Sequence, residues 1–118
     1  MLSEEKSIYL QIAERIENDI LRDIILEEEQ VPSTNEFART LAINPATAAK
    51  GINILVDQGI LYKKRGIGMF VATGAKEIIL NRRKGEFLST FVASLLKEAK
   101  SLGITREEVI QMIQKAED

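Results

Sequence analysis

Two helix N-terminal signals lie close together within residues 33–45, and they constrain the fold more than any other feature. Residues 33–36 (STNE) match the capping box, in which the serine hydroxyl and the glutamate carboxylate each accept a backbone N–H of the other residue. Asn44 is a favourable N-cap, and Pro45 suits the first helical position, where no backbone N–H is required. We therefore predict a short helix to about Leu41, a tight turn and a longer second helix, which is the spacing of a helix-turn-helix.

The longer helix is predicted to have one buried face and one open face. Its apolar residues recur at helical spacing, at Ala48, Ile52, Leu55 and Val56, and Gly59 supplies a stop. The opposite face carries small or hydrogen-bonding side chains and one cation, at Ala46, Thr47, Ala49, Lys50 and Asn53. Such a face can approach another surface closely.

A basic hairpin is predicted directly after this helix. Residues 60–62 and 69–71 favour β-structure, and Gly66 and Gly68 lie between them where a hairpin turn requires positive φ. The turn also contains three consecutive cations, Lys63, Lys64 and Arg65. An ordinary solvated turn would also be polar, but three cations favour contact with phosphates. A small-faced helix followed by a cationic hairpin is typical of a winged helix-turn-helix, which reads DNA.

The N-terminal part is predicted to support these helices. Ser7 is the expected N-cap of a first helix that reaches about Arg22. Its core-facing residues are Tyr9, Ile12, Ala13, Ile16 and Ile20, and its outward residues are Gln11, Glu14, Arg15, Glu17 and Asn18. Residues 23–31 are expected to form a connector with a short strand near 30–31. Its acidic run 27–29 is interpreted as a solvated loop, in preference to a binding site for a cation or a basic partner.

The C-terminal part is predicted to be helical. After a boundary at residues 73–75, we expect a turn or two over 77–81, a helix over 86–102 ended by Gly103, and a last helix opened by the capping box 105–108. The 86–102 helix carries a wide apolar stripe, at Phe87, Leu88, Phe91, Val92, Leu95, Leu96, Ala99 and Leu102. Two amphipathic helices cannot bury such stripes completely against each other. We therefore expect a homodimer, with a groove for a peptide or a small molecule as the alternative.

The fold class is thus expected to be mainly α with a small β-hairpin wing. Residues 1–74 would form a winged helix-turn-helix domain, and residues 75–118 a two-helix dimerisation tail.

Composition limits the function classes. The net charge of −2 and pI of about 5.3 count modestly against DNA binding, but cations gather between Lys50 and Arg65, where Asp57 is the one acid. The chain has no Cys and no His. It therefore lacks the residues that most often bind metals, and also the cysteine nucleophile and the commonest general base. We expect no enzyme activity, no metal and no cofactor. No signal peptide or membrane span is evident, and we expect a soluble cytoplasmic protein.

Three stretches resemble the GntR family of bacterial transcription regulators. They are YLQIAERIENDIL, VPSTNEFARTLAINPATAAKGINILVDQGI and YKKRGIGMFV. The Asn44-Pro45-x-Thr47 helix start and the short helical tail are similar to its YtrA subfamily. The resemblance implies a dimeric repressor on a palindromic operator, with the longer helix in the major groove and the wing in the neighbouring minor groove. It also implies an operon near the protein's own gene that often includes ABC transporter genes.

The resemblance also implies which residues contact DNA. These are Ser33, Asn35, Asn44, Ala46, Thr47, Lys50, Arg65 and Gly66, to which the cationic hairpin adds Lys64. Asn35, Ala49 and Ile67 stand where relatives often carry basic or polar residues, so we expect weaker non-specific binding than in the family. Only residues 75–118 follow the wing, so a large effector domain is not expected. A small-molecule effector, if there is one, is expected at the dimer interface near Phe87 and Phe91, or in a crevice between the tail and the winged domain.

A winged-helix module that docks a protein is the competing function. In that case the open face at Ala46, Thr47 and Ala49 would contact the partner protein, and the acidic pI would fit. The two functions differ in salt dependence, because DNA binding weakens steeply as salt rises, whereas a small apolar contact does not.

Overall fold

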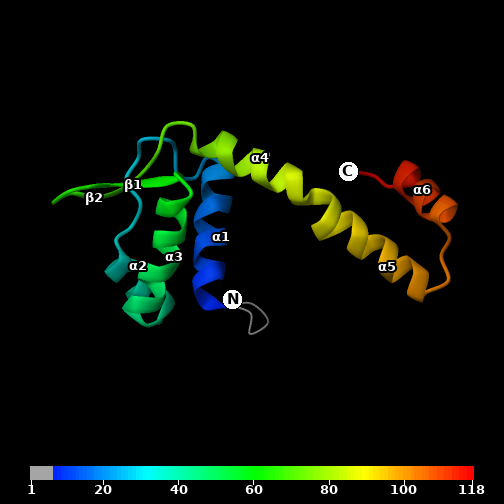
Figure 1. The fold of residues 1–118 in the computed structure, drawn as a ribbon, viewed down its shortest axis with the longest axis horizontal. Helices are drawn as coiled ribbons and strands as arrows, with labels where there is room; N and C mark the ends of the chain where they lie inside the picture. Colours follow the sequence, from blue (N-terminus) through cyan, green and yellow to red (C-terminus); the bar gives the residue numbers. More distant parts are fainter. Residues whose placement is uncertain (1–6) are drawn as a thin grey trace. The chain divides into compact units, whose positions relative to one another are not determined.

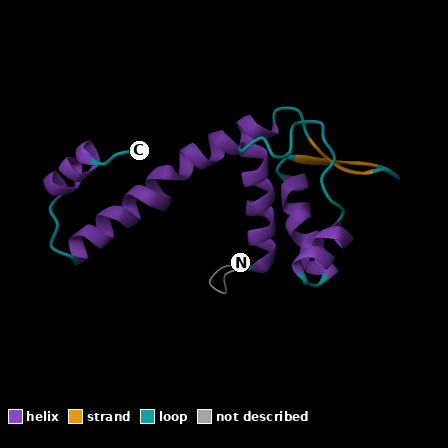
Figure 2. Ribbon diagram, turned by 180° about the vertical axis from the view of Figure 1, so that it is seen from behind, coloured by secondary structure: helices purple, strands orange, loops and turns teal. Residues whose placement is uncertain are grey.

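The computed structural model describes residues 7–118, and it is mainly helical with one two-stranded antiparallel sheet (Figures 1 and 2). The elements are α1 (Ile8–Leu21), α2 (Thr34–Leu41), α3 (Pro45–Asp57), β1 (Leu61–Lys64), β2 (Gly68–Val71), α4 (Ala75–Phe87), η1 (Leu88–Val92), α5 (Ala93–Ser101) and α6 (Arg106–Lys115). This confirms the predicted fold class. The chain divides into two compact units, the first ending at Asn81 and the second running Arg82–Asp118. Residues 1–6 of the expected first domain, with the acidic pair Glu4-Glu5, lie outside the described residues.

The first unit has a single aliphatic core. Helix α1 lies beside α3, and the start of α4 joins the same core (Figure 1). The largest fully buried side chains are all branched aliphatics, namely Ile12, Ile16, Ile20, Ile52, Leu55, Ile60, Leu61, Val71 and Ile79. Because no aromatic residue is among them, packing depends on the close fit of aliphatic groups between helices.

The packing of α1 against α3 depends on Gly51. A Cβ at this position would lie 2.6 Å from the carbonyl oxygen of Tyr9 and 3.1 Å from the Cβ of Ile12. Only hydrogen fits in that space, so glycine here lets the backbones of the two helices approach closely. Hydrophobic periodicity alone does not predict this role of Gly51.

The hairpin pairs in a regular register, and the connector adds to it. Leu61 faces Val71, and Lys64 faces Gly68. Gln30 forms an isolated antiparallel bridge with Phe70, flanked by hydrogen bonds from Val31 N to Met69 O (2.9 Å) and from Val71 N to Glu29 O (3.0 Å). The short strand expected near residues 30–31 is therefore present as a single bridge along β2.

Two details of α1 differ from the prediction. Ser7 occupies the N-cap position, but its side chain makes no capping hydrogen bond. Glu17, expected to face outward, is buried with 4% of its surface exposed. Glu17 lies four residues after Ala13 and three before Ile20, both of which are buried, so the covered arc of α1 is wider than the apolar residues alone indicate.

The expected interruption between residues 81 and 86 is wrong. Segments α4, η1 and α5 follow one another as helix from Ala75 to Ser101, and Gly85 lies inside α4 without breaking it. The middle segment Leu88–Val92 is a π-helix, which shifts the register of the apolar stripe. The hydroxyls of Ser89 and Ser94 donate to the backbone carbonyls of Glu86 (3.1 Å) and Thr90 (3.0 Å) around this segment, and such bonds compete with regular α-helical pairing.

The last helix begins as predicted. Thr105 N donates to the Glu108 carboxylate (3.0 Å) and Glu108 N donates to the Thr105 hydroxyl (3.2 Å), which completes the capping box. Ala99 and Val109 are the buried apolar residues of the second unit.

The contact at Gly51 can be tested with two matched substitutions. Gly51→Ala should lower the free energy of unfolding by about 1–3 kcal/mol, because the added methyl group meets a backbone oxygen and overpacks the interface. Gly85→Ala should instead raise it by about 0.5–1 kcal/mol, since helical alanine is preferred to glycine and nothing lies within 4 Å of a Cβ there. Urea unfolding at one fixed protein concentration measures both. Equal stabilisation by the two substitutions would contradict the close approach.

Candidate nucleic-acid interface

Helix α3 presents the open face that the sequence predicts. The Asn44 side-chain oxygen accepts a hydrogen bond from Ala46 N (2.8 Å), which fixes the start of the helix. Burial of Ala48, Ile52 and Leu55 then sets its rotation and leaves Ala46, Lys50 and Asn53 exposed. Thr47 and Ala49 are half-buried at the edges of this face. The result is a narrow, sterically small helix face with one cation.

Helix α2 directly precedes α3 in the chain, and its N-cap residue, Ser33, is one of the candidate contacts. Ser33 N donates to the Glu36 carboxylate and Glu36 N donates to the Ser33 hydroxyl, each at 3.1 Å. Asn35 is exposed in the first turn. Ala42, in the left-handed conformation with φ of 54°, turns the chain toward α3. The hydroxyl of Ser33 is thus already engaged in the cap, as is the Asn44 oxygen, and both have a structural role.

Lys50 is held by an aromatic ring. Its Nζ lies 4.1 Å from the ring centroid of Tyr9, a residue of α1. This is a cation–π contact, and it orients the ammonium group on the open face of α3. Tyr9 is predicted only as a core-facing residue of the first helix, because nothing in the sequence shows that α1 and α3 approach here.

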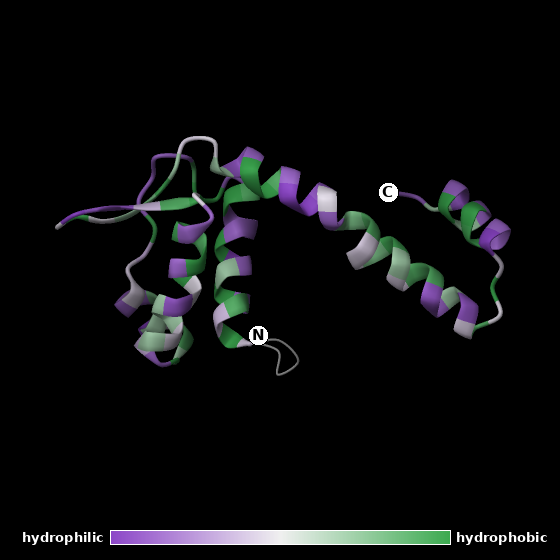
Figure 3. Cartoon of the chain, viewed as in Figure 1, coloured by the Kyte–Doolittle hydropathy of each residue, from purple (hydrophilic) through white to green (hydrophobic). Residues whose placement is uncertain are grey.

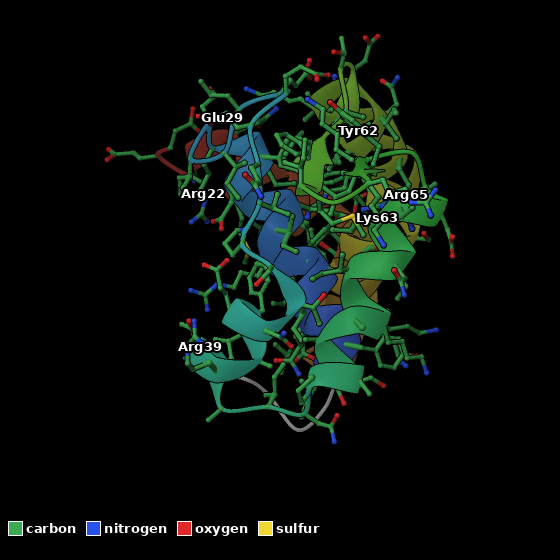
Figure 4. All side chains as sticks on the ribbon, turned by 90° about the vertical axis from the view of Figure 1, so that its left-hand side faces the viewer. Arg22, Glu29, Arg39, Tyr62, Lys63 and Arg65 are labelled. Carbon is green, nitrogen blue, oxygen red and sulfur yellow. The ribbon has the colours of Figure 1, made fainter. Side chains whose placement is uncertain are left out.

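The cations of the hairpin divide between its two faces. Lys64 Nζ lies 4.2 Å from the ring centroid of Phe70, and the Tyr62 and Phe70 rings stack with centroids 6.0 Å apart. Lys63, one residue earlier in β1, points to the opposite face of the hairpin, because successive strand residues alternate. Figure 4 labels Tyr62, Lys63 and Arg65. Arg65 and Gly66 are exposed in the turn, where Gly66 has a φ of +78°.

The acidic run of the connector holds the base of the hairpin. The Glu28 carboxylate accepts hydrogen bonds from the hydroxyls of Tyr62 (2.5 Å) and Thr73 (2.6 Å). The Glu27 carboxylate accepts Gly74 N (2.9 Å) and Lys76 N (3.2 Å), at the start of α4. The run is an exposed loop, as predicted. The sequence did not indicate that two of its carboxylates, those of Glu27 and Glu28, also tie the connector to the hairpin and to α4.

These bonds change the acidity of both partners. The hydrogen bond from Thr73, and then that from Tyr62, lower the pKa of Glu28 below its ordinary value of 4.5. The hydrogen bond to Glu28 raises the pKa of Tyr62 above its ordinary value of 10.0. Glu28 also has a φ of 69°, a conformation that costs free energy for a non-glycine residue and that these side-chain bonds help to retain.

The six apolar residues assigned to dimerisation lie in the second unit. Phe87, Leu88, Phe91 and Leu95 are exposed, and Val92 and Leu96 are half-buried. The Phe87 and Phe91 rings lie against each other with centroids 5.5 Å apart. Figure 3 shows hydrophobic colouring along these tail helices. A single chain therefore leaves several large, neighbouring apolar side chains exposed to solvent.

Neither a metal-binding cluster nor a membrane-spanning helix is present among the described residues. Among residues 7–118, no group of three or more His, Cys, Asp or Glu side chains could hold a metal ion. No helix in the described part of the chain is long and apolar enough to cross a membrane.

Comparison with known proteins identifies relatives of the whole chain. Residues 8–71 match the family model described as bacterial regulatory proteins, gntR family. The chain is 32% identical over 108 residues to the HTH-type transcriptional regulator YhcF of Bacillus subtilis (strain 168), covering 92% of this chain and 88% of YhcF. It is 26% identical over 106 residues to the HTH-type transcriptional repressor YtrA of the same organism, covering 90% and 81%.

Solved structures agree with the fold. A GntR-family transcriptional regulator from Bacteroides thetaiotaomicron superposes with a TM-score of 0.72 at 42% identity, covering 92% of this chain and 94% of that one. The DNA-binding domain of AraR, solved in complex with operator ORX1, superposes with a TM-score of 0.55 at 38% identity, covering 60% and 87%. This similarity is to the DNA-binding domain of AraR, which is the part in that structure.

The Glu28 hydrogen bonds predict a specific pH dependence of stability. The pKa of Glu28 is lowered on folding. Its ionised carboxylate therefore adds to the free energy of unfolding above pH 4.5, and this stabilisation is lost as pH falls through the pKa of the folded state. The pKa of Tyr62 is raised on folding. Its neutral hydroxyl therefore adds to the free energy of unfolding below pH 10.0, and this stabilisation is lost as pH rises through the pKa of the folded state. Glu28→Gln should therefore lower the Tm most between these limits, and the difference from wild type should shrink at both ends. Circular dichroism melting across this pH range measures it.

Glu117→Gln is the control for this experiment. It removes one carboxylate from the exposed C-terminal end, beyond the last helix. Its Tm difference from wild type should be small at every pH. A Glu28→Gln difference that does not vary with pH would contradict the network.

Proposed function

This chain belongs to the gntR family of bacterial regulatory proteins, and we propose that it is a homodimeric transcriptional repressor that binds a palindromic operator. The observation that carries the proposal is the joint presence of a narrow α3 face with a fixed lysine and a cationic hairpin in the segment that matches the family. AraR, whose DNA-binding domain is similar, was solved with operator DNA, which supports DNA as the partner.

Helix α3 is proposed to enter the major groove. A helix fits that groove, and small side chains such as Ala46 and Thr47 let the backbone approach the base edges closely. Lys50 donates to guanine O6/N7 or to a phosphate. The capped starts of α2 and α3, with Ser33, Asn35 and Asn44, direct backbone N–H groups at phosphates.

The hairpin is proposed to follow the neighbouring minor groove. Lys64, Arg65 and Gly66 would contact the backbone or the groove itself. All three are exposed, and Gly66 allows close backbone approach at the turn. The three cations from Lys63 to Arg65 supply the attraction to phosphate that the chain as a whole, with a net charge of −2, lacks.

The tail is proposed to join two copies. We assign residues 1–74 to DNA binding and residues 75–118 to dimerisation, where a second copy covers Phe87, Leu88, Phe91 and their neighbours. A two-fold dimer places two winged domains on half-sites separated by about 34 Å, or a multiple of one DNA turn, which explains a palindromic operator. A small-molecule effector that controls binding would be sought at this dimer interface.

The biological setting is proposed from the family resemblance. The operator lies near the protein's own operon, and ABC transporter genes are the first candidates for regulated genes. The protein would act in the cytoplasm, where the DNA is.

The test is a titration of the DNA upstream of the protein's own gene, with wild type and Lys50→Ala, at two or more salt concentrations. Wild type should bind this duplex more tightly than a scrambled one, as two chains per site and with steep salt dependence. If Lys50 reads a base, the substitution should cost about 1–3 kcal/mol on the operator alone. If it holds a phosphate, affinity should fall equally on both duplexes and the salt slope should fall by about one.

Tyr9→Phe and Tyr9→Leu separate the ring from the hydroxyl in the same titration. Phenylalanine retains a face for the Lys50 ammonium group, so its affinity should stay near wild type, whereas leucine should show part of the Lys50→Ala loss. No binding by wild type at low salt would instead favour a protein-docking module. Unchanged binding by Lys50→Ala on both duplexes would remove Lys50 from the interface.

Dimerisation predicts that Phe91→Glu produces monomers. The Phe91 side chain is 62% exposed in the single chain, so the substitution should leave the protomer folded while placing a charge in the dimer interface. Lys97→Glu is the matched control, because Lys97 is exposed and lies outside the apolar stripe. Sedimentation velocity should show a dimer for wild type and Lys97→Glu, and a monomer for Phe91→Glu. A monomeric wild type, or a Phe91→Glu dimer, would contradict the assignment.

A further inference from the structure

The hairpin tip carries one apolar side chain that the proposed DNA contacts do not use. Ile67 is 63% exposed, and it directly follows the cationic segment Lys63–Arg65 and Gly66. A single exposed aliphatic residue is ordinary on a protein surface. The surroundings of Ile67 are what distinguish it.

The backbone of Ile67 is fixed from both sides. Its N–H donates to the Lys64 carbonyl (2.9 Å), which closes the turn. Its carbonyl accepts a hydrogen bond from the Gln30 side-chain amide (3.0 Å), which reaches the tip from the connector. The tip is therefore held against the part of the chain that already pairs with β2.

Glycines flank Ile67, and the turn requires both of them. Gly66 has a φ of +78° and Gly68 a φ of +146°, and a Cβ at Gly68 would lie 2.5 Å from the Gln30 amide nitrogen. Ile67 is thus the one side chain within the segment 66–68. The tip is narrow, and its shape suits a groove about 6 Å wide, such as the minor groove of DNA.

We propose that Ile67 is a specificity-determining residue that selects A·T pairs where the wing lies in the minor groove. This inference rests on the proposed operator binding. In the minor groove, G·C pairs differ from A·T pairs by the guanine N2 amine, which is a hydrogen-bond donor. The isoleucine side chain has no acceptor, so an amine covered by it loses water and gains no partner.

The cations beside Ile67 also favour A·T pairs. A·T-rich tracts have a narrow minor groove with enhanced negative potential, which attracts Lys and Arg. Arg65 is exposed in the turn, two residues before Ile67, and the exposed Lys63 and Lys64 precede it in β1. The apolar contact excludes G·C pairs, and the flanking charges favour the groove shape that A·T pairs adopt.

The test changes only the minor-groove amine. In the operator found by the titration above, A·T pairs are replaced one at a time by 2,6-diaminopurine·T, which adds the amine, and G·C pairs by inosine·C, which removes it. Fluorescence anisotropy gives the affinity. For wild type, diaminopurine should weaken binding at least about fivefold at the pairs under the wing, because a donor is left unsatisfied there.

Two isoleucines make a matched comparison. Ile67→Gln supplies an acceptor for the amine and should reduce the diaminopurine penalty at least about threefold, since the donor regains a partner. Ile24→Gln makes the same change at an isoleucine of equal exposure, 64%, in the connector. It should retain the full penalty. Gln30→Leu, which removes the bond to the Ile67 carbonyl, should reduce the penalty while leaving Ile67 in place.

Each outcome decides between the two proposals. A penalty that persists unchanged in Ile67→Gln overturns the role of Ile67 and leaves operator binding intact. So does a wild-type protein that is indifferent to the added amine at every pair. Absence of operator binding by wild type overturns the proposed function, and the role of Ile67 falls with it.

Discussion

The rest of the first unit depends on the close backbone contact between α1 and α3 at Gly51. A hydrogen at this position lets the carbonyl oxygen of Tyr9 approach α3 to a distance that no side chain would permit. The buried Ile12 and Ile52 then pack between the helices. The neighbouring residue, Lys50, is brought onto the Tyr9 ring by the same contact. One small residue therefore determines both the core packing and the orientation of the only cation on the open face of α3.

Polar interactions position the wing, because few of its residues are buried in the core. The hairpin extends away from the helices (Figure 1), and it is anchored in the core by the buried Leu61 and Val71, with Met69 partly buried against them. Carboxylates of the connector hold the rest, with Glu28 bound to Tyr62 and Thr73. The acids that make this chain anionic overall thus orient its cationic segment. A family member can have a net charge of −2 and still present a positive segment at the wing, because the carboxylates of Glu27 and Glu28 are bonded to N–H and O–H donors at the base of the hairpin.

The features that could be predicted from the sequence are local ones. The capping boxes at Ser33 and Thr105 and the cap at Asn44 join residues two or three positions apart, and all three are present. Hydrophobic periodicity likewise predicted the helices and the buried face of α3. The hairpin followed from its glycines and β-prone flanks. These signals need no knowledge of how distant segments meet.

The missed features join residues far apart or depend on context. The bonds from Tyr62 to Glu28 and from Gln30 to Ile67 span 34 and 37 positions, so no spacing rule reveals them. Residues 82–85 carry no apolar side chain and include Gly85, which has a weak helix propensity, yet the helix continues through them. The face expected to contact DNA was thus predictable as a set of residues, whereas its rigidity was not. That rigidity comes from Tyr9, Gln30 and Glu28, none of which belongs to the predicted contact set. It is also what gives a DNA reader its selectivity, because a side chain that can move away from a mismatched base pair imposes a smaller energetic penalty on that pair than one that is held in place.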